Sequence, residues 1–398
     1  MRVYFITTYP FPYGVAGTSR LQCYAKSILA QGVECKVLIY VRTESCKVKR
    51  GNSEGCGVFE GIPFEYISHT PFRDNGLIKR KWCDLLDRKR LLSFLYNNLN
   101  QGDIVYYFAS NELIWIPLVI KVSHQKKAFF VKELCELPYG TTKETIINKL
   151  KRNFIFKHQF PMYDGIMSIS DSLLSLAKEK SSDKTKHLKV PIMVDYTKFA
   201  LPDNSSMAKE FYIFHAGSMF EQKDGFVGMI EAFGIASRKL NHQIKFISTG
   251  NINKSPHAEE VREIINKYDI KDDIRFTGYL NNEELRDYLS KASVVIINKY
   301  KTQQNIYCFS TKLAEYLAAS KPVIITRVGE AMNWLSDRED AYVIEPHNVN
   351  ELADAIVTLY QNKELRKKIE KGGNILCQNS FRYEVYGKTL ANFFASFS

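Results

Sequence analysis

Several features are missing from this sequence, and each absence excludes a class of protein. No stretch approaches the roughly 18 uncharged apolar residues that a membrane-spanning helix needs. The longest apolar run, Leu113 to Ile120, contains Pro117 and ends at Lys121. The N-terminus shows no signal-peptide pattern, because Met1-Arg2 leads directly into a strand-like apolar run with no cleavage site after it. We therefore expect a cytoplasmic protein without a membrane span.

Metal-binding and dinucleotide-binding motifs are also missing. The eight cysteines include no CxxC pair, and the eight histidines form no HExxH pattern. We therefore expect free thiols in a reducing cytoplasm and no metal site. The sequence also lacks the GxGxxG fingerprint with its acidic partner, which argues against a Rossmann dehydrogenase.

What is present is the composition of a globular protein. The chain has 398 residues, of which 45% are hydrophobic and 25% are charged. Disordered, collagen-like and coiled-coil proteins have different compositions. The length is too great for one ordinary hydrophobic core and indicates two domains of similar size.

Positive charge is concentrated in the first half of the chain. Residues 1–195 contain 29 lysines and arginines against 18 acidic residues, whereas residues 196–398 contain 26 against 25. The basic clusters lie at 47–50, 79–81, 88–90 and 149–157. They indicate either an anionic partner or a solubility feature; an anionic lipid surface attracts such clusters by about 1 kcal/mol per basic residue. We expect no nucleic-acid partner, because no nucleic-acid-binding module is recognisable.

Strand-like and helix-like segments alternate along both halves, which predicts parallel sheets covered by helices. The alternation stops near Pro191, passes through a polar stretch at 202–209 and restarts at Phe211. We predict an α/β protein with an N-terminal Rossmann-like domain over 1–194 and a second one over 195–379. The C-terminal helix, about 380–398, is expected to pack back on the first domain. Ligands of such sheets bind at the carboxyl ends of the strands, so a cleft between the two domains is the expected active-site region.

The segment from Ser310 to Val323 carries the strongest functional signal. Ser310 is a suitable N-cap, and Leu313, Ala314, Leu317 and Ala318 share the helix face expected to pack on the sheet. Lys312 and Glu315 share the other face, where they form either a solvated ion pair or part of a ligand site. A lysine in the first turn faces the positive end of the helix dipole, where an anion is preferred. A bound diphosphate would explain this lysine, with Ser310, Thr311 and Lys312 as its ligands and Glu315 as an acceptor of ribose hydroxyls.

This segment resembles the donor-site signature of retaining family-4 glycosyltransferases of the GT-B fold, of the type found in bacterial polysaccharide biosynthesis. The shared positions are a Ser, a Lys two residues on, a Glu three residues later, then Tyr-Leu-Ala and Lys-Pro-Val-Ile. The resemblance implies two doubly wound Rossmann-like domains facing one another across a cleft. It also implies that the Glu holds the ribose of the donor while the Lys and the helix amides hold the diphosphate.

Two further segments resemble the same family. Gly217-Ser218 follows a strand, and Lys223-Asp224-Gly225 opens the next helix. The resemblance makes Gly217, Ser218 and Lys223 diphosphate ligands, and Lys223 the stabiliser of the departing nucleoside diphosphate. Alone, Lys223 would be read as an exposed loop lysine.

The Phe276 to Leu280 segment resembles the strand end that meets the nucleotide base. Gly278 and Tyr279 are therefore the candidate base contacts, and Tyr279 is interpreted equally as a stacking residue or a core residue.

The first half resembles the family only in outline. Gly14 to Arg20 resembles its glycine-rich acceptor loop, in which Gly17 would permit close approach of a ligand. Arg20 either pairs with phosphate or the acceptor, or has no such role. The segment Lys132 to Pro138 resembles the cleft floor, where many members carry a His and then an acid. Here Cys135 stands at the His position, and Glu136, matching the acid, is a candidate catalytic carboxylate that acts on or binds an acceptor hydroxyl.

Two positions depart from the commoner family pattern. Tyr307 stands where many members have a glutamate that contacts the donor sugar, and Ser218 stands where many have an arginine. Both occur in a subgroup of similar polysaccharide enzymes. The nucleotide half of the donor site therefore looks complete, while the sugar half, including Tyr307, is altered.

Together these features predict an enzyme, a hexosyltransferase. It would move a hexose or modified hexose from a nucleoside-diphosphate sugar to a hydroxyl of a glycan or a polyprenyl-diphosphate-linked acceptor, in capsule, O-antigen or exopolysaccharide synthesis. The resemblance implies retention, no cofactor and no metal. A peripheral position at the inner face of the cell membrane, through the basic first half, is a further expectation. The alternatives are a non-catalytic GT-B partner protein and a GT-B-like nucleotide-sugar epimerase.

Overall fold

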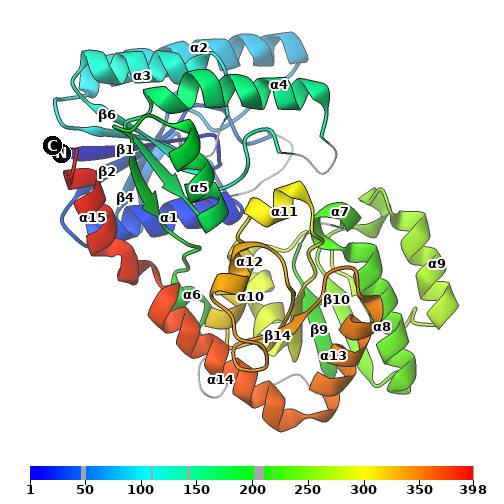
Figure 1. Ribbon diagram of the computed structural model, residues 1–398. Coiled ribbons are helices and arrows are strands. Elements are labelled where there is room, and N and C mark those ends of the chain that lie inside the picture. Colours follow the sequence, from blue (N-terminus) through cyan, green and yellow to red (C-terminus); the bar gives the residue numbers. More distant parts are fainter. Residues whose placement is uncertain (46–50, 109–110, 141–143, 201–209, 218, 398) are drawn as a thin grey trace. The chain divides into compact units, whose positions relative to one another are not determined.

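The chain folds into two compact units, drawn together in Figure 1. The computed structural model describes residues 1–45, 51–108, 111–140, 144–200, 210–217 and 219–397. Unit 1 comprises Met1–Met193 and Tyr383–Ser398, and unit 2 comprises Val194–Arg382. The chain thus returns to unit 1 at its end, where helix α15 (Gly387–Ala395) packs on helix α1 (Ala16–Leu29). The sequence-based division placed the boundaries at 194/195 and about 380.

Unit 1 is built on an eight-stranded sheet with the order β3-β4-β2-β1-β5-β6-β7-β8. The strands are β1 (Arg2–Thr7), β2 (Glu34–Ile39), β3 (Cys56–Phe59), β4 (Ile62–Tyr66), β5 (Ile104–Phe108), β6 (Phe129–Leu134), β7 (Gly165–Ser168) and β8 (Lys186–Lys189). All neighbours pair in parallel except β3 and β4, which form an antiparallel hairpin at one edge. The central strand β5 is buried throughout, and β1 is buried from Val3 onward, as strands covered on both faces require.

Helices surround this sheet. They are α1, α2 (Leu77–Asn98), α3 (Trp115–Gln125), α4 (Ile146–Phe154), α5 (Asp171–Lys180) and α15, with η1 (Ile155–Gln159) and η2 (Phe160–Met162) continuing α4 and η5 (Tyr383–Tyr386) preceding α15. The core between sheet and helices is rich in aromatic side chains, including Phe5, Tyr24, Tyr106 and Phe394. The β3–β4 hairpin and the 22-residue helix α2 lie in a region whose sequence carries little motif content.

Unit 2 is built on a six-stranded sheet with the order β11-β10-β9-β12-β13-β14, in which every pairing is parallel. The strands are β9 (Phe211–His215), β10 (Ile244–Ser248), β11 (Ile274–Phe276), β12 (Val294–Ile297), β13 (Val323–Thr326) and β14 (Tyr342–Ile344). The helices are α6 (Tyr196–Phe199), α7 (Glu221–Asp224), α8 (Phe226–Lys239), α9 (Ala258–Tyr268), α10 (Asn282–Lys291), α11 (Gln303–Tyr307), α12 (Thr311–Ala318), α13 (Val349–Gln361) and α14 (Lys363–Ser380), with 3-10 turns η3 (Ile252–Lys254) and η4 (Gly329–Asn333).

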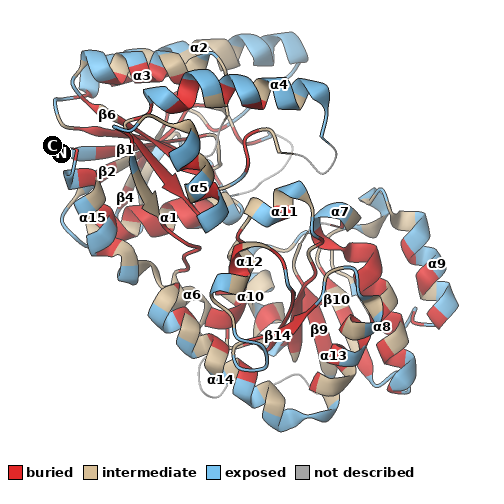
Figure 2. Ribbon diagram, viewed as in Figure 1, coloured by how far each residue is buried: buried red, intermediate tan, exposed pale blue. Residues whose placement is uncertain are grey.

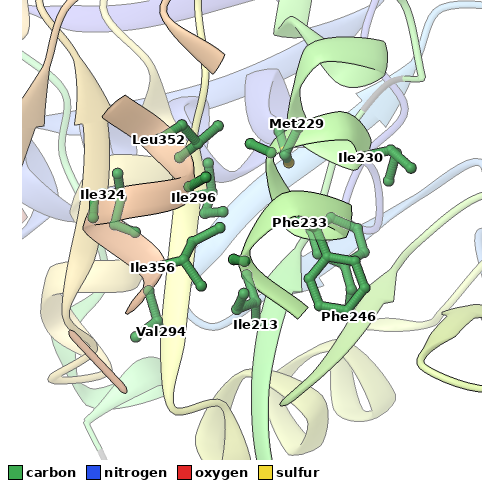
Figure 3. Close-up of a cluster of buried hydrophobic side chains, with 14 of the residues drawn as sticks. Ile213, Met229, Ile230, Phe233, Phe246, Val294, Ile296, Ile324, Leu352 and Ile356 are labelled. Atoms are coloured by element: carbon green, nitrogen blue, oxygen red, sulfur yellow. The ribbon is translucent and has the colours of Figure 1, made fainter. Parts of the chain in front are cut away.

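The core of unit 2 lies between this sheet and the helices α8 and α13 (Figure 3). Phe233 of α8 packs against Phe246 of β10 with its ring tilted, and the ring centroids lie 5.3 Å apart. Ile356 of α13 lies beside Ile213 and Val294 of the central strands (Figure 3). This packing fixes the sheet, and with it the strand ends that carry the candidate site. Among the described residues, no helix is long and apolar enough to cross a bilayer.

Candidate functional site

Helix α12 begins one residue after Ser310 and presents the faces that its apolar spacing predicts. Its buried residues include Leu313, Ala314 and Leu317, while Lys312 and Glu315 are partly buried. Ser310 occupies the N-cap position with extended backbone, but its side chain makes no capping hydrogen bond. Neither Ser310 nor Thr311 is fully exposed. The first-turn amides of α12 are thus left without the side-chain cap that the sequence predicts.

Two lysine ammonium groups share one buried carboxylate beside the start of α12. Asp224 is only 5% exposed. The Lys299 Nζ lies 3.4 Å from its Oδ1, and the Lys312 Nζ lies 3.9 Å from its Oδ2. Burial lowers the pKa of Lys312, the Asp224 carboxylate acts in the opposite direction, and the Lys299 and Lys223 ammonium groups lower the pKa further. The cluster therefore carries excess positive charge in a partly desolvated place, which favours an anion.

Gly217 lies directly against this cluster. A Cβ at this position would collide with the Lys312 Nζ and would lie 2.7 Å from the His215 Nε2. The amide of Gly217 donates to the Thr249 Oγ1 at 3.2 Å, so the turn is held in place. A side chain at this position would displace the Lys312 ammonium group or press on the buried His215 ring, so glycine leaves the most room for both groups. The predicted ligand Ser218 lies outside the described residues.

His215 and Lys299 belong to this cluster, although sequence reasoning did not select them. His215 is buried at the end of β9, and its Nδ1 lies 3.1 Å from the Ser248 Oγ. Burial and the Lys312 ammonium lower the pKa of His215 to about 3, so the ring is neutral at physiological pH. Lys299 follows β12 by two residues. Both positions were open to prediction from the rule that ligands meet the carboxyl ends of parallel strands.

Lys223 is exposed at the edge of the same cluster. It lies on α7, whose last residue Asp224 precedes Gly225 in the left-handed conformation with φ of 56°. The Asn305 Nδ2 donates to the Lys223 backbone carbonyl at 3.2 Å, and the Asn298 Nδ2 donates to that of Gly225 at 2.8 Å. The backbone of Lys223 is therefore fixed while its ammonium group is open to a ligand.

Glu315 lies one turn further along α12. Burial raises the pKa of its carboxyl to about 7, although the Lys312 ammonium acts in the opposite direction. The neighbouring Tyr316 hydroxyl accepts a hydrogen bond from the Ala216 amide at 3.1 Å, which ties α12 to the end of β9. The ion-pair partner of Lys312 is Asp224, at 3.9 Å, which argues against the solvated Lys312–Glu315 pair that was one of the two interpretations of the sequence.

The predicted base contacts, Gly278 and Tyr279, follow the end of β11. Gly278 exchanges two backbone hydrogen bonds with Gly250, at 2.8 and 3.0 Å. Tyr279 follows Gly278 and is 80% exposed, which excludes the interpretation of Tyr279 as a core residue. An exposed ring held by a paired turn is suited to stacking. Tyr307 ends α11 and is partly buried.

In unit 1 the structure places the Arg20 side chain inside a network of buried hydrogen bonds. This side chain is 3% exposed, and its Nε donates to the Glu133 Oε1 at 2.9 Å. Its other nitrogens donate to the Tyr24 hydroxyl and to the carbonyls of Val190 and Pro191. The guanidinium is satisfied within the protein, so Arg20 is a structural residue in this conformation.

Of the other two candidate residues in unit 1, Gly17 lies within a helix and Glu136 lies exposed after a strand. Gly17 lies inside the first turn of α1 rather than in the predicted loop, and a Cβ there would lie 2.6 Å from the ring of Tyr9. The glycine is therefore explained by packing against Tyr9. Glu136 is exposed after β6, beside the partly buried Cys135. Burial raises the pKa of the Cys135 thiol to about 12.

Unit 1 also buries an unexpected cation. Lys132 was expected to follow a strand but lies inside β6, which extends to Leu134. Its side chain is 2% exposed, with its Nζ 5.5 Å from the centre of the Tyr107 ring. Burial lowers its pKa to about 8. Among the described residues, no group of three His, Cys, Asp or Glu side chains is placed to hold a metal ion, and none of the seven described cysteines forms a disulfide.

Comparison with known proteins finds a family match that lies within unit 2. Residues 199–375 match the family model described as glycosyl transferases group 1. An uncharacterized glycosyltransferase of Methanocaldococcus jannaschii is 24% identical over 235 residues, 59% of this chain and 60% of the relative. A lipopolysaccharide core biosynthesis glycosyltransferase of Rhizobium meliloti is 26% identical over 183 residues, 46% of this chain and 48% of the relative. The chain thus spans between about half and three fifths of these curated relatives.

Solved structures match the chain over its whole length. The Anabaena protein HepE, solved in complex with UDP and glucose, superposes with a TM-score of 0.72 at 13% identity and covers 100% of both chains. At this identity the likeness establishes the fold. The predicted fold class is confirmed: the chain is an α/β protein of the GT-B fold, and the glycosyl transferases group 1 match lies in its second unit.

Proposed function

We propose that this chain is a glycosyltransferase that takes a hexose or modified hexose from a nucleoside-diphosphate sugar. The observation that carries the proposal is the cluster of Lys299 and Lys312 around Asp224, beside the start of α12, where the Ser310 side chain makes no capping hydrogen bond. Two ammonium groups and one carboxylate leave a net positive charge, and helix amides add to it. A diphosphate matches this charge. The family match over 199–375 and the UDP-bound HepE structure support the same ligand class.

Different residues of this region are proposed to bind different parts of the donor. Lys312, Thr311, Ser310 and the turn at Gly217 would hold the diphosphate, Glu315 the ribose, and Tyr279 the base. When the bond between sugar and phosphate breaks, negative charge develops on the departing phosphate. The exposed ammonium group of Lys223 would stabilise this charge, since a cation aimed at developing charge lowers the barrier.

The proposal also covers the acceptor. We propose transfer to a hydroxyl of a glycan or lipid-linked oligosaccharide, with retention and without a metal. Because the chain offers no evident nucleophile, attack from the face of the leaving group is the proposed route, with the leaving phosphate taking the acceptor proton. Glu136 would bind or act on the acceptor. The lipopolysaccharide core enzyme among the relatives supports a role in surface polysaccharide synthesis.

Calorimetric titration with a panel of nucleoside diphosphates tests the donor proposal. One base should be preferred, and the matching nucleotide sugars should be hydrolysed slowly in the absence of acceptor. Lys223→Ala should keep nucleotide affinity within a few-fold and lower this turnover by at least about tenfold. Absence of both nucleotide binding and turnover would instead identify a non-catalytic partner protein, the alternative that the altered position Tyr307 favours.

A further inference from the structure

The helix α4 turns its apolar face to the solvent, whereas a helix that packs on its own protein turns this face to the core. Four exposed apolar side chains form the stripe, namely Ile146 (79% exposed), Ile147 (63%), Leu150 (63%) and Phe154 (45%). At about 100° per residue they fall within one face about 100° wide. Figure 2 shows much of this helix as exposed.

The inward face of the same helix is the polar one. Arg152 is 7% exposed and pairs with Glu144, while Asn148 is partly buried. The helix is nevertheless well formed, since the Thr145 side chain caps it by accepting from the Asn148 amide at 3.2 Å. An amphipathic helix normally turns its apolar stripe to the core. The inversion therefore calls for an apolar environment outside the protein.

The charge around the stripe has one sign. The helical segment 146–162 contains four lysines and arginines and no acidic residue. Lys149 and Lys157 are exposed. An apolar stripe with basic flanks is the composition of helices that lie in the plane of an anionic bilayer surface.

The start of α2 repeats this composition in the same unit. Leu77, Ile78 and Trp82 are exposed by 74%, 88% and 61%, and the intervening Lys79, Arg80 and Lys81 are exposed as well. Both helical segments are anchored to Glu112, which precedes α3. The Arg88 Nη2 of α2 lies 2.6 Å from the Glu112 Oε1, and the Gln159 Nε2 donates to the Glu112 carbonyl at 3.0 Å.

We propose that the exposed stripe of α4, assisted by the start of α2, binds an anionic lipid bilayer. A second copy of the chain fits less well, because a two-fold interface would bring each Lys149 and Lys157 toward the same cations of its partner. Nucleic acid would account for the basic residues but not for three exposed aliphatic side chains. Lipid accounts for both. This inference does not depend on the donor chemistry of unit 2.

Vesicle flotation of the full chain tests the proposal. The protein should float with vesicles of phosphatidylcholine and phosphatidylglycerol at low salt, and less at high salt, because salt screens the basic flanks. Ile147→Ser combined with Leu150→Ser should lower the partition coefficient by about tenfold, since both side chains lose their contact with the acyl region. Lys149→Gln combined with Lys157→Gln should reduce the salt dependence, and the remaining part should come from the basic residues at the start of α2.

A matched control uses exposed apolar residues elsewhere in the same unit. Val58 and Ile114 are exposed by 70% and 71%, and Val58→Ser combined with Ile114→Ser should leave flotation unchanged. Equal flotation of the α4 variant and the wild type would overturn the proposal. So would a dimer in light scattering that the α4 variant converts to a monomer, since the stripe would then be a self-interface. Nucleotide titration of the same variants tests the donor proposal separately.

Discussion

Two clusters of buried charge, one in each unit, are neutralised to different extents. In unit 1, Arg20 and Glu133 form an ion pair whose remaining hydrogen-bonding groups meet tyrosine hydroxyls and backbone carbonyls. In unit 2, Lys299 and Lys312 share the single carboxylate of Asp224 at 3.4 and 3.9 Å. The first arrangement is complete without a ligand, whereas the second leaves positive charge to be neutralised. Burial of a charge alone is therefore a poor guide to a binding site; the balance of partners separates structural from ligand-binding cations.

The largest loss of stability is expected from a substitution that breaks the Arg20–Glu133 ion pair of unit 1. Arg20→Met leaves Glu133, which is 1% exposed, as a buried carboxylate without its cation. Removing one partner of a buried pair costs about 3–5 kcal/mol. The destabilisation should appear in hydrogen–deuterium exchange as faster exchange of the amides in β1 and β6, while those of β9 in unit 2 stay protected. The affinity for nucleoside diphosphate should be unchanged.

Arg2→Met is the matched control, because Arg2 pairs with Glu34 in the same unit but both side chains are largely exposed. Such a pair contributes little to stability, because both charges are already solvated. If Arg20→Met were as mild as Arg2→Met, or if it weakened nucleotide binding selectively, the assignment of Arg20 to structure would fail and the contrast between the units would disappear.

The second effect concerns nucleotide binding by the cluster of Lys299, Lys312 and Asp224 in unit 2, here called the incomplete arrangement because its positive charge is not fully neutralised. Lys312→Met should weaken binding of the preferred nucleoside diphosphate by about 10–100-fold, because a partly desolvated charge-assisted contact is lost. The free nucleoside should be affected far less. The melting temperature should stay equal or rise, since burial already lowers the pKa of Lys312 and its charged form is disfavoured in the absence of a ligand.

Lys239→Met provides the comparison within unit 2, because Lys239 on α8 is half exposed and pairs with Asp354. It should change neither affinity nor stability by a measurable amount. A Lys312 variant that melts much lower and binds nucleotide normally would make this lysine structural, like Arg20.

Local sequence patterns predicted the elements of the site better than its contacts. The apolar spacing of 310–319 predicted helix α12 within one residue at each end. The misplaced charge of Lys312 also indicated an anion. These are properties of neighbours in the chain, which periodicity and helix electrostatics describe. The assignment of the ligand-binding residues remains a prediction.

Contacts between distant residues were not predictable in this way. Arg20 looked like a ligand because its partner, Glu133, lies 113 residues away. Asp224 and Lys299 are 75 residues apart, and nothing local marks them as a pair. Gly17 was expected in a loop because glycine signals turns, yet packing against Tyr9 places it in the first turn of α1. Tertiary packing overrides local preference at such positions.

The smallest effect tests whether Glu315 belongs with the incomplete arrangement. Its pKa in the folded protein, about 7, lies above the ordinary value of 4.5. The folded state therefore binds more protons than the unfolded state between these values, and its stability falls as pH rises through this window. Glu315→Gln removes this loss. The variant should melt like the wild type at about pH 5 and gain about 1 kcal/mol at pH 8, a value reduced by solvent screening of a partly buried group.

A bound nucleotide should instead favour the ionised form of the Glu315 carboxyl. If the ribose hydroxyls donate to Glu315, they stabilise the carboxylate, so nucleotide affinity of the wild type should fall as pH drops below about 7. Glu315→Gln should bind more weakly and lose this pH dependence. Glu263→Gln, at an exposed position on α9, should reproduce neither effect. A wild-type affinity that is flat from pH 5.5 to 8 would separate Glu315 from the ligand, leaving Lys299, Lys312 and Asp224 as the whole of the incomplete arrangement.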